Sequence, residues 1–283
     1  MQQFEWRDLG QVDYNELGQT KNQVHQAIQL VAAVGRKFRE VSPNDDNATL
    51  SWIPGLTRLA GKWVQGNKTF RTSLGLIDFC IYIVDEKVNT ISKFSLNGKN
   101  QTQVLLWMEE QIGKLDLDAS DLTLHLPYSI PSYGTQDGEP FLVDLKMANE
   151  LSKYYHNTFI CLRDLYKKTE GDNPDINIWP HHFDEAMTII VKDTGDDETN
   201  STVMLGMSPG DNEFNRPYFY VNTWPHVDTS KLGSSPTGAF WHEQLWTGTV
   251  LPVEEVLAAE NQKSMIDTFY ERASHVLIQA LKS

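Results

Sequence analysis

The fold is decided by the stretch Leu76-Ile77-Asp78-Phe79-Cys80-Ile81-Tyr82-Ile83-Val84, which is apolar on both faces of an extended chain. A strand of this kind belongs inside a sheet that is covered on both sides. Shorter, loosely alternating runs flank it at 51–53, 62–73 and 88–96, and such runs are typical of neighbouring strands joined by hairpins. We therefore expect an antiparallel sheet in the first half of the chain.

Long helices are predicted over 13–40, 101–114 and 144–168, where apolar residues recur at helical spacing. Further strands are expected at 122–126, 176–183, 186–191, 203–207, 217–223 and 239–249, and a final helix from Pro252. The fold class is therefore α+β, with a large antiparallel β-sheet packed by long α-helices. We expect a single compact unit, 1–283. The order helix, strands, helix occurs twice, so two similar halves, 1–138 and 139–283, stay open.

The charge of the chain limits its partners. It has 24 Lys and Arg against 38 Asp and Glu, a net charge of −14. Such a surface repels phosphate backbones and anionic lipid, so we expect no nucleic acid and no membrane partner. No apolar run approaches the roughly 20 residues that span a bilayer, and the first residues do not resemble a secretory signal. We expect a cytoplasmic protein whose two cysteines, Cys80 and Cys161, are buried apolar side chains.

The candidate site centres on Ile178-Trp179-Pro180-His181-His182-Phe183-Asp184. If this stretch is extended, Trp179 and His181 share one face, whereas His182 and Asp184 share the other. Imidazole and carboxylate are suitable ligands for zinc, iron or manganese. We expect His242, from a neighbouring strand, to be the third ligand of a divalent metal with His182 and Asp184. His226 is the alternative third ligand, and Asp211 or Glu213 could supply a fourth. The whole site would lie within 176–252.

A turn and an aromatic strand extend this candidate site. Ser208-Pro209-Gly210-Asp211 fits a type II turn, which would aim Asp211 at the histidines. There Asp211 would orient a water molecule for metal-assisted hydrolysis. Tyr218 and Tyr220 are expected to share a face of their strand. A small, flat or apolar molecule could bind to the wall formed by His181, Trp179, Tyr218, Tyr220 and Trp241.

Plainer interpretations stay open. Pro180 interrupts strand hydrogen bonding, so the chain could bend there and the alternation of faces would fail. His181 would then stack between aromatic rings, and the pocket would hold no metal. The aromatic residues could equally form an ordinary core or a homodimer interface, in a scaffold or interaction protein without catalytic activity. Whether the protein is an enzyme is therefore undecided by its sequence.

Five segments, read in order, resemble a bacterial family of conserved proteins of unknown function. They are Trp179-Pro-His-His-Phe-Asp184, Ser208-Pro-Gly-Asp211, Pro217-Tyr-Phe-Tyr-Val221, Trp241-His242 and Thr249-Val-Leu-Pro252. The resemblance is strongest over 176–257, and a weaker likeness extends through the first half. It implies an intracellular α+β protein and no particular substrate. It also implies that the histidine, Ser-Pro-Gly-Asp and Trp-His segments belong to one shared site.

Overall fold

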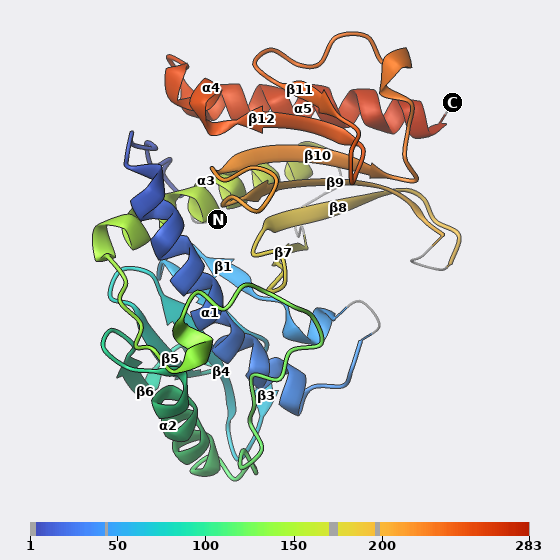
Figure 1. Ribbon diagram of the computed structural model, residues 1–283. Coiled ribbons are helices and arrows are strands. Elements are labelled where there is room, and N and C mark those ends of the chain that lie inside the picture. Colours follow the sequence, from blue (N-terminus) through green and yellow to red (C-terminus); the bar gives the residue numbers. More distant parts are fainter. Residues whose placement is uncertain (1–3, 43–44, 170–174, 196–198, 283) are drawn as a thin grey trace. The chain divides into compact units, whose positions relative to one another are not determined.

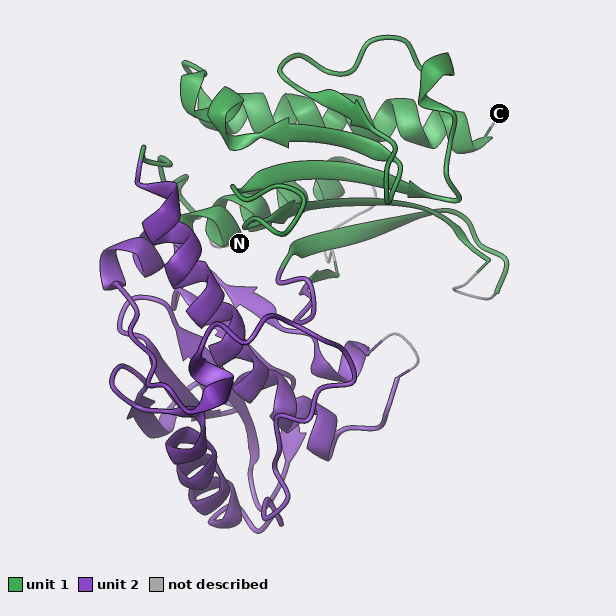
Figure 2. Ribbon diagram, viewed as in Figure 1, with its two compact units in different colours: residues 1–11, 153–177, 184–283 green, residues 12–152, 178–183 purple. Residues whose placement is uncertain are grey.

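The computed structural model describes residues 4–42, 45–169, 175–195 and 199–282 (Figure 1). The chain forms two compact units, coloured separately in Figure 2. Unit 1 comprises residues 1–11, 153–177 and 184–283, and unit 2 comprises residues 12–152 and 178–183. The chain therefore passes from one unit to the other several times. The predicted division at residue 138 stays a prediction.

Unit 2 is built around the helix α1 (Tyr14–Phe38), which Asp13 caps by accepting a hydrogen bond from the backbone N–H of Asn15. Its antiparallel sheet has the order β1-β2-β4-β5-β6, and β3 also pairs with β4. These strands are β1 (Ser51–Ile53), β2 (Arg58–Ala60), β3 (Val64–Gln65), β4 (Thr69–Gly75), β5 (Cys80–Asp85) and β6 (Thr90–Ser95). The helix α2 (Gln101–Gly113) begins at a capping box between Asn100 and Gln103. Buried apolar residues of α1 face β4, so this helix covers the sheet.

The sheet of unit 1 is antiparallel, with the order β11-β12-β10-β9-β8-β7. Its strands are β7 (Ile176–Ile178), β8 (Glu185–Lys192), β9 (Ser201–Ser208), β10 (Tyr218–Trp224), β11 (Phe240–His242) and β12 (Gly248–Pro252). One face packs against α5 (Gln262–Lys282), and Tyr270 of this helix makes two contacts with the sheet. Its ring lies edge-on to Phe219, and its hydroxyl donates to the Gly206 carbonyl at 2.9 Å. The opposite face carries Tyr218 and Tyr220.

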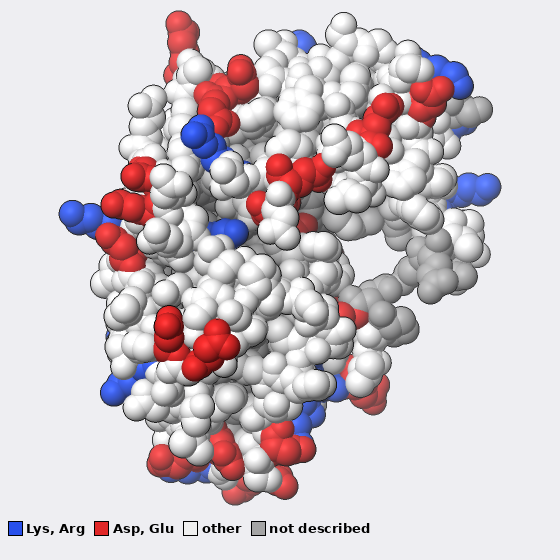
Figure 3. Space-filling view, in the orientation of Figure 1, with Lys and Arg blue, Asp and Glu red and all other residues white. Residues whose placement is uncertain are grey.

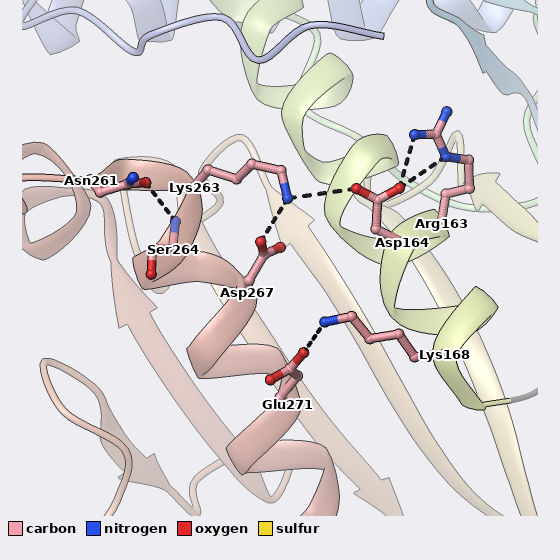
Figure 4. Close-up of polar contacts among 8 residues, drawn as sticks. All are labelled: Arg163, Asp164, Lys168, Asn261, Lys263, Ser264, Asp267 and Glu271. Carbon is pink, nitrogen blue, oxygen red and sulfur yellow. Dashed lines mark hydrogen bonds and ion pairs between the residues drawn. The ribbon is translucent and has the colours of Figure 1, made fainter. Parts of the chain in front are cut away.

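Charged side chains join α5 to the unit 1 part of α3 (Leu145–Thr169), as Figure 4 shows. The Nζ of Lys263 lies 3.6 Å from Asp164 and 2.6 Å from Asp267, and Lys168 pairs with Glu271. These groups are partly exposed, so each pair contributes about 0–1 kcal/mol to stability. Cys161 of α3 is buried and so is Cys80, and both are free thiols, which confirms the prediction for the cysteines.

The α+β class with antiparallel sheets is confirmed, although the strands form two six-stranded sheets. The strand predicted across 76–84 is only partly right, because the chain turns at 76–79, where Phe79 has a φ of 46°, and β5 begins at Cys80. Residues 122–126 pair with no strand, so that prediction is wrong. Their alternation is real, since the three leucines are half-buried and Thr123 and His125 exposed, but no neighbouring strand accompanies it.

The last helix is divided into α4 (Val253–Ala258) and α5, and the short strand β2 was not predicted.

Among the residues that the structure describes, no helix has both the length and the apolar character needed to cross a membrane. The cytoplasmic location stays a prediction.

Candidate functional site

The histidine-rich stretch forms a turn, so the predicted strand over 176–183 is wrong beyond Ile178. The N–H of Phe183 donates to the carbonyl of Trp179 at 2.7 Å, and Phe183 has a φ of 63°. Pro180 supplies no N–H for a strand ladder, which is the physical reason for the turn. The side chains therefore do not alternate, and the rings of His181 and His182 lie 4.3 Å apart.

Two side chains of α1 hold this turn in unit 2. The Pro180 carbonyl accepts hydrogen bonds from His25 Nε2 at 2.9 Å and from Gln29 Nε2 at 2.7 Å. The His25 ring also stacks on Phe183, with centroids 5.1 Å apart and planes 8° apart. Burial lowers the pKa of His25 to about 4. It is therefore neutral at pH 7 and serves as a structural support of the turn.

His181 lies in an aromatic environment within unit 2. Its ring centroid is 5.4 Å from that of Tyr128 and 6.0 Å from that of Trp179. Burial, and then the neighbouring charges of His182 and Arg36, lower the pKa of His181 to about 4. A neutral imidazole results, beside an exposed His182.

The remaining predicted site residues belong to unit 1. Tyr218 and Tyr220 lie on one face of β10, with ring centroids 6.0 Å apart. In the register of the sheet Tyr220 is opposite Gly206 of β9. A Cβ atom at Gly206 would lie 2.7 Å from the Tyr220 hydroxyl, so only glycine leaves room for this ring.

The Tyr220 hydroxyl donates a hydrogen bond to Oδ2 of Asp184, which immediately precedes β8. Both residues are buried. Burial, and then the charge of Asp184, raise the pKa of Tyr220 well above its ordinary value. The tyrosine therefore stays a neutral donor, and the pair fixes one end of β8 against β10.

Asp211 organises the loop between β9 and β10. Its Oδ1 accepts from the N–H groups of Glu213 at 2.8 Å and Phe214 at 2.9 Å, and its Oδ2 accepts from the Tyr218 hydroxyl at 2.6 Å. Gly210 before it has a φ of 103°, and a Cβ there would lie 3.1 Å from the backbone of Asn215. The positive φ expected in the Ser-Pro-Gly-Asp turn is thus present. Asp211 acts as a positioning residue for Glu213, Phe214 and Tyr218.

His242, at the end of β11, is buried next to this loop. Its Nε2 lies 3.1 Å from Oε1 of Glu213. Its ring centroid lies 4.3 Å from that of Trp246 and 5.7 Å from that of Phe214. Phe214 in turn packs against Tyr218, with a centroid separation of 5.0 Å. His242 therefore packs against Glu213 and Phe214, and these two side chains form a wall in front of it.

A hollow of about 450 Å³ opens in front of this wall. Its lining combines apolar side chains with carboxylates, amides and one guanidinium. Its lining consists of Asn212, Glu213, Phe214, Asn215, Arg216, Pro217, Tyr218, Val250, Pro252 and Glu254. We define this as the β10 hollow.

Of the predicted residues, the structure brings Tyr218, Asp211 and His242 to the β10 hollow or its supporting wall. Trp241, the neighbour of His242 on β11, donates from Nε1 to the Gly233 carbonyl at 2.9 Å and does not line the hollow. Trp179, His181 and His182 belong to unit 2. The described ranges contain no group of three or more His, Cys, Asp or Glu side chains that could hold a metal ion.

Phe214 and Arg216 were not singled out as site residues from the sequence, and Glu213 was considered only as an alternative metal ligand. The signal that could have found them is the run 212–216, which lies between the turn residue Gly210 and the strand that begins at Tyr218. A loop that starts with a tight turn and carries two charges and an aromatic residue is a common place for binding groups.

Residues 9–277 match the model of a family of unknown function, DUF5996. The chain belongs to that family, which confirms the predicted resemblance to a conserved family of unknown function. Neither the search of the curated proteins nor the search of the solved structures gave a match. The function therefore has to be argued from the site itself.

Proposed function

We propose that unit 1 binds a small organic molecule in the β10 hollow, and that this ligand carries a flat apolar body and a positive charge. The observation that supports the proposal is the position of Glu213. Its carboxylate lines the hollow beside the rings of Phe214 and Tyr218, and His242 contacts it from behind. Apolar hollows with a few polar groups held in place are the usual form of small-molecule sites.

The apolar part of the ligand follows from the lining. Phe214 and Tyr218 supply aromatic rings, and Pro217, Val250 and Pro252 supply aliphatic surface. Aromatic rings bury a large area for little loss of conformational freedom. A flat ligand of one or two rings fits a volume of about 450 Å³.

The positive charge follows from the two carboxylates of the hollow. Arg216 pairs with Glu254 at 2.6 Å. Glu213 lies 3.1 Å from His242, and its carboxylate is the one that we propose for the cation. A cation in this position would also meet the faces of aromatic rings, an arrangement that is favourable by about 0.5–2 kcal/mol. The net charge of −14 adds a general attraction for cations.

Three small probes that share one body test this proposal. They are 2-phenylethylamine, which is a cation at pH 7, 2-phenylethanol, which is neutral, and 3-phenylpropanoate, which is an anion. Isothermal titration should give the tightest binding for the amine, by about tenfold over the alcohol, because a charge-assisted hydrogen bond contributes about 1.5–3 kcal/mol. Equal binding of all three, or preference for the anion, would contradict the proposal.

A metal-dependent hydrolase that uses His182, Asp184 and His242 stays a separate hypothesis. Elemental analysis of the purified protein tests it, with His242→Ala as the matched variant.

A scaffold protein without a ligand is the other alternative. It predicts that none of the three probes binds and that the melting temperature stays constant in their presence.

A further inference from the structure

A second hollow, of about 450 Å³, lies in unit 2 beside α1. It is bounded by α1, by the first residue of α2 and by the segment 123–136. Four glutamines contribute to it, Gln26 and Gln29 from α1 together with Gln101 and Gln136, and Tyr128 and His125 lie among them. We define this as the glutamine hollow. Its lining shares no residue with the β10 hollow.

The two buried glutamines of α1 are fixed by hydrogen bonds. Gln26 is only 1% exposed, and its Oε1 accepts from Gln101 Nε2 at 3.1 Å and from Gln136 Nε2 at 3.2 Å. Gln29 is also 1% exposed, and its Oε1 accepts from the Tyr128 hydroxyl at 2.8 Å. Buried amides that are held on several sides form a rigid polar wall.

The outer glutamines have hydrogen-bonding capacity left for a ligand. An amide side chain offers two donors and an acceptor with two lone pairs. Gln101 and Gln136 each use one N–H group on Gln26. Their carbonyl oxygens accept no hydrogen bond from the residues that the structure describes. Each therefore offers a donor and an acceptor in the lining of the hollow.

No Asp, Glu, Lys or Arg lines the glutamine hollow within the described ranges. Figure 3 shows uncharged surface on unit 2 that is interrupted by groups of acidic side chains. In a chain with 24 basic and 38 acidic residues, a lining without a charged side chain is a distinct chemical environment. Arg36 donates to the Tyr128 hydroxyl from outside the lining. A charged ligand would find no counter-charge in the lining itself, so the loss of its hydration would be costly.

The segment from Lys114 to Asp144 that bounds this hollow has no regular structure except the 3-10 helix η2 (Thr135–Asp137). Long irregular segments in compact domains are uncommon and are frequently functional. This segment is held to α1 through Tyr128 and through the Pro131 carbonyl, to which Gln26 donates. A long loop without regular secondary structure thus bounds a hollow whose lining is polar and uncharged.

We propose that the glutamine hollow binds a neutral, hydroxyl-rich small molecule of the class of an uncharged mono- or disaccharide. Adjacent hydroxyl groups of such a ligand act as donor and acceptor together and match the amides of Gln101 and Gln136. The hollow is mainly polar, so it favours a polyol over a flat apolar ring. The inference is independent of the function proposed for unit 1, because the two hollows share no lining residue.

The experiment uses the intact protein and ligand-observed NMR with a panel of sugars. The neutral probes are glucose, galactose, xylose, N-acetylglucosamine and maltose, and the charged counterparts are glucuronate and glucosamine. At least one neutral sugar should bind, at least fivefold more tightly than both charged counterparts. Binding of none of the neutral sugars, or tighter binding of a charged one, would overturn the proposal. Preference for the flat probe adenine over every sugar would also overturn it.

A near-isosteric variant assigns the binding to this hollow. Gln136→Glu places a carboxylate at an exposed position of the lining, so the fold should be retained, as circular dichroism would verify. Affinity for the neutral sugar should fall at least fivefold, and binding of glucosamine should rise. Gln244→Glu adds the same charge at an exposed position of unit 1 and should change neither. If the two variants behave alike, the assignment is wrong.

Discussion

The hydroxyl of Tyr220 donates to the carboxylate of Asp184, and this bond joins the central strand β10 to the start of β8 in unit 1. Both side chains are buried. Without the Tyr220 hydroxyl, the buried Asp184 carboxylate loses a hydrogen bond that replaces its contact with water. We expect Tyr220→Phe to lower the free energy of unfolding by about 1–3 kcal/mol, measured by urea denaturation.

Tyr218→Phe is the matched control, since it removes the same atom two residues earlier on the same face. Its acceptor, Asp211, is exposed and also accepts from two backbone N–H groups. The loss should be smaller, about 0.5–1 kcal/mol. A larger loss for Tyr218→Phe than for Tyr220→Phe would contradict this account of the sheet face.

Glu185, on the opposite face of β8, should make stability depend on pH. It is fully buried, and neither carboxylate oxygen has a hydrogen-bond partner within the described part of the chain. Burial, and then the charge of Asp184, raise its pKa well above the ordinary 4.5. The folded state therefore holds this proton more tightly than the unfolded state does. Glu185 opposes folding increasingly as the pH rises above 4.5 toward the folded-state pKa.

We expect Glu185→Gln to be more stable than the wild type at pH 7, by an amount on the order of 1 kcal/mol or more. The difference should shrink as the pH is lowered toward 4.5, because the wild-type carboxyl then becomes protonated in both states. Melting temperatures measured from pH 4.5 to 8 check this. A difference that is constant over this range would show that Glu185 is ionised in the fold.

His25 should produce the opposite pH dependence. Its folded-state pKa of about 4 lies below the ordinary value of 6.5. The contribution of neutral His25 is therefore complete above pH 6.5 and is lost as the pH falls toward 4. Between pH 7.5 and pH 5 the wild type should lose roughly 2 kcal/mol from this group.

The variant His25→Gln isolates that contribution, because an amide can still donate to the Pro180 carbonyl but does not titrate. Urea denaturation of both proteins at the two pH values gives the comparison, and the wild type should show the larger decrease. NMR titration of the imidazole protons is an independent check. A midpoint for His25 near 6.5 would mean that its ring is hydrated and does not support the turn.

Local sequence signals predicted the helices well. Asp13 and Asn100 are caps that act within a few residues, and such short-range interactions can be read directly from a sequence. The histidine turn shows the limit of periodicity. In an extended chain His182 and Asp184 would share one face, but Pro180 removes a donor, and Phe183 takes a positive φ that no pattern indicates.

The candidate site depends on contacts between residues that are far apart in the chain. Most of these contacts could not be predicted from the sequence. His242 and Glu213 meet because β11, β12 and β10 pair in one register. A one-residue shift in that register would turn His242 to the other face. Gln26 and Gln29 were hidden for a different reason, because polar residues on a helix are ordinarily exposed, whereas these two are buried against the 123–136 segment.

The most direct test of the account is the affinity of 2-phenylethylamine for three forms of the protein, measured by isothermal titration at pH 7. Glu213→Gln removes the charge that lines the β10 hollow, whereas Glu243→Gln removes an equal charge at an exposed position outside its lining. The account predicts that Glu213→Gln weakens binding by about tenfold, and that Glu243→Gln matches the wild type. Equal affinity in all three forms would contradict the claim that Glu213 recognises the ligand.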